Sequence, residues 1–187
     1  MTQSTTVFAQ ILRLVPRTLF DRLATGYRVD KHASVFRGMT HFAVLMFAQL
    51  VGLKSTHEIQ HATVSLFSWQ RQGGLAAVKK STLADANRQV SWRFYRDLFH
   101  SLLPLYRHHF DGHKFPVPGD LLTLDSTLIP VCLERFPWAT YRTRKGALKL
   151  HTLLDHQGHL PRDVVMTDGR VHDLRIARKM RVQPGTT

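Results

Sequence analysis

The sequence is poor in cysteine. One cysteine, Cys132, occurs among 187 residues. This excludes a disulfide framework and a cysteine-based metal cluster. A chain with so little cysteine fits a reducing compartment.

Long apolar runs are also lacking. The longest, from Phe42 to Leu53, is interrupted by Gln49 and Gly52 and is too short to span a bilayer. The N-terminal region has no secretory pattern, because charged residues interrupt its apolar positions. We therefore expect a soluble protein of the cytoplasm, with no membrane partner.

Acidic residues are scarce relative to basic ones. The chain has 13 Asp and Glu against 26 Lys and Arg, a net charge of +13. The excess is found in both halves of the chain, so no single basic tail accounts for it. Such a charge indicates a polyanionic partner, nucleic acid before an anionic membrane surface. The hydrophobic fraction of 43% is ordinary for a globular protein and argues against global disorder.

The N-terminal part, residues 1–114, predicts an all-helical domain. The predicted helices cover residues 5–24, 39–52, 55–69 and 81–110. Pro16 should kink or split the first of them. The expected core face of the second consists of Phe42, Leu45, Met46, Leu50 and Val51.

The starts of the last two helices carry capping signals. Ser55 or Thr56, followed by Glu58, predicts the start of the third helix. Ser81 or Thr82, with Asp85, resembles a capping box at the start of the fourth.

These two helices have the outline of a helix-turn-helix, although their connection is long for the strict motif. The candidate DNA-contacting residues at the start of the fourth helix are Lys79, Lys80, Ser81, Thr82 and Asn87. That end can meet phosphates through free N–H groups and base edges through side chains. The alternative is a plain helix pair whose first turn happens to be basic.

A boundary is expected near residue 114, where Gly and Pro residues punctuate the chain and the periodicity changes from helical to strand-like. His108, His109 and His113 lie in this segment. A metal site there has little support, because no cysteine or carboxylate is positioned beside them.

Residues 115–187 predict three hairpin-joined strands and then a helix, so the chain as a whole is assigned to the α+β class. The predicted strands are 121–131, 147–154 and 163–167, and the predicted helix is 171–181.

The first strand has apolar residues on both faces, the pattern of a central strand, with Asp125 in its middle. A carboxylate there is costly unless it is paired, hydrogen-bonded or bound to a metal. The bland interpretation is an Asp that pairs with an arginine or caps a turn.

On the second strand, Lys149 and His151 share one face and are expected near a carboxylate of the neighbouring strand. The connector before that strand is basic. Its Arg142, Arg144 and Lys145, together with Lys149, are candidates for contact with a DNA backbone. The alternative is a solvated loop between strands.

Five motifs occur in a particular order along the chain. They are Lys-Ser-Thr-Leu-Ala-Asp-Ala-Asn at 80–87, Leu-Asp-Ser-Thr-Leu-Ile at 124–129, the run from Phe-Pro-Trp to Leu-Leu-Asp at 136–155, Leu-Pro at 160–161, and Thr-Asp-Gly-Arg-Val-His-Asp at 167–173. In this order and spacing they resemble the bacterial insertion-sequence transposases of the type-four family, over about residues 5–183. The resemblance implies a helical N-terminal domain and the first part of an RNase H-like catalytic domain of the DDE class.

The resemblance also implies a role for Asp125 as the first catalytic acid. In the family it shares two Mg²⁺ or Mn²⁺ ions with a second Asp, on a strand after the helix that matches 171–181, and with a later Glu. Two such ions activate a water or a 3′-hydroxyl and stabilise the leaving oxygen of a phosphodiester. Hard oxygen ligands suit Mg²⁺.

The chain departs from the family pattern at its C-terminal end, residues 183–187. The remaining acids of the second half are explained by turns and helix starts; they are Asp155, Asp163, Asp168 and Asp173. We therefore expect a C-terminally truncated transposase that is inactive alone and binds no metal stably.

The implied partner is double-stranded DNA at the element ends, in the bacterial nucleoid. An alternative is a non-catalytic DNA-binding remnant that binds these ends or interferes with full-length transposase. A three-stranded sheet with one helix would leave an edge and a face uncovered. This predicts self-association, or association with full-length transposase.

Overall fold

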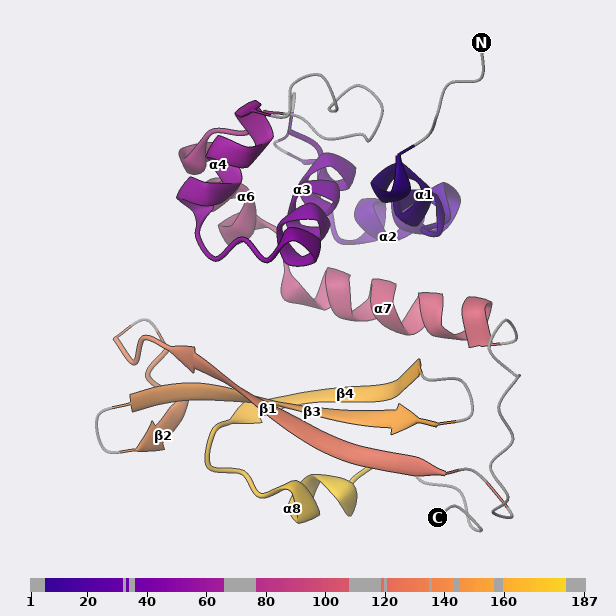
Figure 1. The fold of residues 1–187 in the computed structure, drawn as a ribbon, viewed down its shortest axis with the longest axis vertical. Coiled ribbons are helices and arrows are strands. Elements are labelled where there is room, and N and C mark those ends of the chain that lie inside the picture. Colours follow the sequence, from indigo (N-terminus) through magenta and orange to yellow (C-terminus); the bar gives the residue numbers. More distant parts are fainter. Residues whose placement is uncertain are drawn as a thin grey trace. The chain divides into compact units, whose positions relative to one another are not determined.

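The chain divides into two compact units, Met1–Leu102 and Leu103–Thr187. The structure, a computed structural model, describes residues 6–31, 33, 36–65, 77–107, 119, 121–134, 136–142, 145–156 and 160–180 (Figure 1). The expected boundary near residue 114 lies outside the described residues, as do His108, His109 and His113.

The first half of the chain is helical, as predicted. Its helices are α1 Val7–Arg13, α2 Arg17–Gly26, α3 Gly38–Val51, α4 Thr56–Ser65, α6 Lys80–Gln89 and α7 Trp92–Arg107. Pro16 separates α1 from α2, as expected, and takes the extended backbone of a helix N-cap. Gly52, in the left-handed conformation with φ 78°, ends α3. No helix among the described residues is long and apolar enough to cross a membrane.

The predicted fourth helix is wrong as a continuous element. The helix breaks at Val90, whose extended backbone ends α6. The Ser91 hydroxyl then accepts the Arg93 N–H at 3.3 Å, at the start of α7. The capping box at Ser81 or Thr82 is also wrong. The N-cap of α6 is Lys79, without a side-chain bond, and Asp85 pairs with Arg88 instead.

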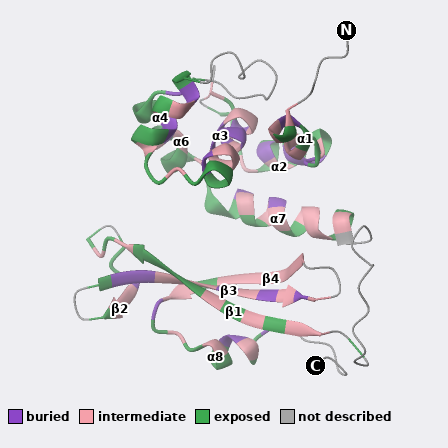
Figure 2. Ribbon diagram, in the orientation of Figure 1, coloured by how far each residue is buried: buried purple, intermediate pink, exposed green. Residues whose placement is uncertain are grey.

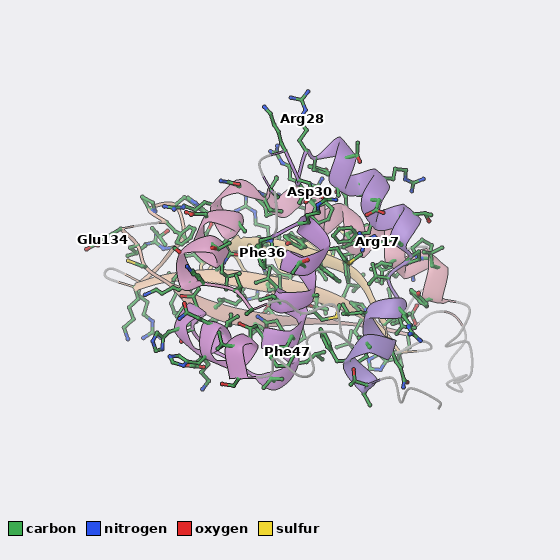
Figure 3. All side chains as sticks on the ribbon, turned by 90° about the horizontal axis from the view of Figure 1, so that it is seen from above. Arg17, Arg28, Asp30, Phe36, Phe47 and Glu134 are labelled. Carbon is green, nitrogen blue, oxygen red and sulfur yellow. The ribbon has the colours of Figure 1, made fainter. Side chains whose placement is uncertain are left out.

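The capping prediction for α4 is confirmed. The Ser55 hydroxyl accepts the Glu58 N–H at 3.2 Å and donates to the Glu58 carboxylate at 3.1 Å. The start of α3 is held differently: the Asp30 carboxylate accepts the Gly38 N–H at 2.6 Å. Figure 3 shows Asp30 in the segment beside α3, whereas Arg28 extends away from the helices.

The buried residues of the helices, purple in Figure 2, form two clusters. One contains Ala43, Val44, Ala48, Ile59, Val78 and Leu83. The other contains Val15, Leu19, Phe20, Ala24, Phe94 and Leu98. The expected core face of α3 is wrong at Leu50 and Val51, which are 58% and 57% exposed. Because α3 is apolar all round, its periodicity says little about which side is buried.

The second half of the chain forms an antiparallel sheet and a helix, as predicted for the α+β class. The elements are β1 Leu122–Val131, β2 Thr140–Arg142, β3 Lys145–Asp155, β4 Leu160–Asp168 and α8 Asp173–Ala177. The short β2 lies in a segment expected to be a connector. Helix α8 is shorter than the expected 171–181.

Strand β3, and not β1, is the central strand of this sheet. It pairs with β1 along one side and with β4 and β2 along the other (Figure 1). The residues of β1 are exposed or half-buried, so the expectation of a central strand buried on both faces is wrong for the described sheet.

Helix α8 covers one face of the sheet. Leu153 of β3 packs there against Ile176 and Met180. Side chains alternate between the two faces of a strand, so Ser126, Lys149 and His151 share the covered face with Leu153. Asp125 lies on the opposite face.

Candidate functional site

Asp125 occupies the middle of β1 and is exposed on the face that α8 leaves open. Its register partner on β3 is Thr152, and its Oδ1 accepts the N–H of Ser126 at 2.7 Å. Within the part of the chain that the structure describes, no ion pair involves Asp125. The alternative in which Asp125 pairs with an arginine therefore finds no support. Because the carboxylate is exposed, water can solvate its charge.

The described residues do not by themselves form a two-metal centre. They contain no group of three or more His, Cys, Asp or Glu that could hold a metal ion. Asp125 supplies one carboxylate, whereas a pair of divalent ions needs several oxygen ligands.

Lys149 and His151 do meet a carboxylate, but not the expected one on the neighbouring strand. Asp125 lies on the other face, and the partner is Asp173 at the start of α8. The Asp173 Oδ1 lies 3.0 Å from the Lys149 Nζ and 2.9 Å from the His151 Nδ1. The Lys149 ammonium and the Ser126 hydroxyl hold the pKa of Asp173 below its ordinary value, against the effect of burial.

Sequence reasoning missed Asp173, which it explained as a helix-start residue. The N-cap of α8 is His172, whose Nδ1 accepts the Leu174 N–H at 3.3 Å. Asp173 is the first helical residue, and its carboxylate faces the sheet. The alternation of Lys149 and His151 indicated that a carboxylate was needed on this face, but only the packing of α8 identifies it.

Asp173, His151 and Thr167 follow the carboxylate–imidazole–hydroxyl order of a nucleophile triad. The geometry does not fit that role. The Thr167 hydroxyl donates to the Asp168 carbonyl at 2.9 Å, so its proton is not directed to the imidazole. The His151 side chain is 0% exposed, which keeps a substrate away from the ring. The group therefore serves the structure of this unit.

The candidate DNA-contacting end of α6 is exposed at Lys79, Lys80 and Ser81. One of its free N–H groups is already used, because the Gln60 Oε1 accepts the Lys80 N–H at 2.7 Å. A phosphate at this end would therefore meet the lysine side chains more than the backbone of Lys80.

Asn87 is exposed, but its side chain contacts a buried residue of the helical unit. Its Oδ1 lies 2.7 Å from the Nε2 of the buried His41, and the His41 Nδ1 lies 3.0 Å from the Tyr95 hydroxyl. Burial lowers the pKa of His41, although the bond to Asn87 acts in the other direction. A neutral His41 that donates to Asn87 and accepts from Tyr95 satisfies both contacts. The expected DNA contact of Asn87 remains a prediction.

The basic connector offers two exposed cations in the described residues. Arg142 is exposed, with its guanidinium 5.3 Å from the centroid of the Tyr141 ring, and Lys145 is exposed. Arg144 lies outside the described residues. The Lys149 side chain is 16% exposed and pairs internally, so its expected DNA contact would compete with Asp173.

Comparisons with known proteins bear on both halves of the chain. Residues 3–65 match the family described as a domain of unknown function, DUF4372, and residues 117–183 match the transposase DDE domain, which covers β1 to α8. The chain is 30% identical over 156 residues to a probable transposase for insertion sequence element IS5377 from Geobacillus stearothermophilus, a match that covers 80% of this chain. No solved structure matches. The chain spans 37% of the length of that relative. On these matches, the chain belongs to the insertion-sequence transposases that carry a DDE domain.

Proposed function

We propose that this chain takes part in the transposition of an insertion sequence by metal-dependent phosphodiester cleavage and strand transfer, and that Asp125 is its first catalytic acid. The observation that carries the proposal is an exposed carboxylate in the middle of β1, within the stretch that matches the transposase DDE domain. Transposases of the DDE class generally use divalent metal ions. Asp125 is the residue that we propose as a ligand for Mg²⁺ or Mn²⁺.

We further propose that the 187-residue chain is inactive alone. One carboxylate cannot hold the ions of a two-metal site, and the described residues contain no group of three or more His, Cys, Asp or Glu that could hold a metal ion. The DNA downstream of codon 187 tests this proposal. An open frame that continues into a strand with an Asp would supply the second acid of an enzyme. An immediate stop codon would favour a remnant.

The second candidate function is non-catalytic binding of double-stranded DNA at the element ends, in the nucleoid, with interference against full-length transposase. The exposed cations at two places support it, Lys79 and Lys80 in the helical unit, Arg142 and Lys145 beside the sheet. A net charge of +13 supports the same class of partner. We also propose that the chain is a member of the type-four family of insertion-sequence transposases and that its second half belongs to an RNase H-like domain.

We expect the chain to associate with itself through β1. This strand forms an edge of the described sheet, and the apolar Ile129, 40% exposed, lies on the open face near its end. Ile129→Lys places a charge on this edge, which opposes strand pairing between chains. Sedimentation velocity at rising concentration should show larger species for the wild type and less of them for the variant.

A matched control is Val64→Lys, which puts the same charge on a residue of α4 that is 55% exposed. It should associate as the wild type does. A wild-type chain that stays monomeric at about 100 μM, or a control that loses association equally, would rule out the β1 edge. Exposed strand edges associate at concentrations on the order of micromolar to millimolar, so association should be visible at about 100 μM.

A further inference from the structure

A group of polar side chains lies on the covered face of the sheet, directly under the middle of β1. The Asp173 Oδ1 is 2.9 Å from the His151 Nδ1 and 3.0 Å from the Lys149 Nζ. The His151 side chain is 0% exposed and that of Lys149 is 16% exposed. Buried charges of this kind persist where they are paired, so the group is a built feature of the unit and not a solvated surface.

The His151 ring is held from both sides. Its Nε2 lies 3.0 Å from the Thr167 hydroxyl of β4, which donates to the Asp168 carbonyl at 2.9 Å. Its Nδ1 is buried and lies 2.9 Å from the Asp173 Oδ1. The ring therefore lies between β4 and the start of α8.

The same group ties three segments together. Lys149, on β3, also donates to the carbonyl of Val171 at 3.2 Å, so it holds the chain that leads into α8. Asp173 forms an ion pair with Lys149, and the Ser126 hydroxyl of β1 helps to lower the pKa of Asp173. Ser126 faces His151 in the register of β1 and β3.

Ser126 is the residue next to Asp125 in the chain. Successive side chains of a strand point to opposite faces, so a hydroxyl held on the covered face fixes the neighbouring carboxylate on the open face. A slip or rotation of β1 would break the Ser126 contact and move Asp125 at the same time.

We propose that Ser126, Lys149, His151, Thr167 and Asp173 form a positioning network that clasps α8 to the sheet and sets the place of Asp125 on β1. The assignment of Asp125 as the residue to be placed rests on the proposed function above. None of the five touches DNA or metal in this role. Lys149 is then a positioning residue in place of a DNA contact.

The test uses the whole 187-residue chain, labelled with ¹³C and ¹⁵N, and two NMR readouts, the carboxyl ¹³C signal of Asp125 and amide hydrogen exchange in β1. In Asp173→Asn the Asp125 signal should shift, because the ion pair that holds Lys149 and α8 together on the covered face is lost. Amide hydrogen exchange at residues 123–127 of β1 should speed up at least tenfold, a loss of about 1.4 kcal/mol in local stability.

Two further variants keep the test decisive. Ser126→Ala, a mild change, should speed exchange at the same β1 amides and shift the Asp125 signal. Asp163→Asn is the matched control, since the Asp163 carboxylate of β4 accepts the neighbouring Val164 N–H at 2.8 Å, and it should leave both readouts unchanged. If Asp173→Asn unfolds the C-terminal unit, the Ser126→Ala result decides.

An Asp125 signal and a rate of β1 exchange that neither variant alters beyond the Asp163→Asn control would overturn the proposal. Neither readout involves DNA binding or cleavage. A failure here therefore leaves the proposed transposase function standing, and a failure of that function leaves the network intact.

Discussion

Raising the salt concentration from 50 to 200 mM is expected to weaken the binding of duplex DNA to this chain about a hundredfold. Each neutralised phosphate contributes about −0.9 to the slope of log affinity against log salt. Four exposed cations are candidate contacts: Lys79, Lys80, Arg142 and Lys145. Together they give a slope of about −3.6, which corresponds to roughly two decades over this range. Fluorescence anisotropy with a labelled duplex measures it.

The double variant Lys79→Ala/Lys80→Ala should reduce that slope by about 2, because each phosphate-contacting lysine carries about one unit. Affinity should fall by a similar factor for all sequences, since phosphate contacts carry no sequence information. Arg22→Ala/Lys31→Ala removes the same charge from exposed positions elsewhere in the helical unit. This control should leave the slope of log affinity against log salt almost unchanged. A salt-insensitive affinity, or equal losses in the two double variants, would argue against a specific surface at α6.

Phe94→Ala is expected to destabilise the helical unit by about 3–5 kcal/mol. Phe94 is 0% exposed, and its ring lies against Phe20 at 5.2 Å, Tyr95 at 5.0 Å and Tyr27 at 6.1 Å between centroids. The loss removes the transfer free energy of the ring and leaves a cavity between α2 and α7. It is a large part of the roughly 5–15 kcal/mol of a typical domain.

Urea unfolding followed by far-ultraviolet circular dichroism measures this loss. Leu105→Ala, on the same helix but 47% exposed, is the control and should cost less than about 1 kcal/mol. A loss for Phe94→Ala no larger than that of the control would show that the Phe20–Phe94 cluster does not hold the helices together.

The helices were predictable where a local signal decides them. Pro16 breaks α1 from α2 through its own backbone, and Ser55 with Glu58 caps α4 within one turn. The break between α6 and α7 was not predictable in this way, because Val90, Phe94 and Leu98 continue the same apolar spacing across it. Val90, partly buried, packs against the cluster that contains Phe94, so the apolar stripe continues although the backbone turns.

The sheet shows where alternation alone fails. Apolar residues on both faces of β1 predicted a central strand. Which strands pair is decided by tertiary structure, however, and in the described sheet β3 is the central strand. Asp125 was found as an exception to an apolar run, and a family resemblance gave it a role. Asp173 was set aside because a helix start explains an Asp locally. Only the packing of α8 brings it to Lys149 and His151.

We propose that this chain binds the DNA of its element and carries the first acid of a DDE site that it does not complete alone. The most direct measurement incubates the purified 187-residue chain with a labelled duplex that contains the repeats flanking its gene, in Mg²⁺ and then in Mn²⁺. We expect a retarded but intact duplex, with Asp125→Asn binding equally well. Metal-dependent cleavage or joining of that duplex by this chain would contradict it.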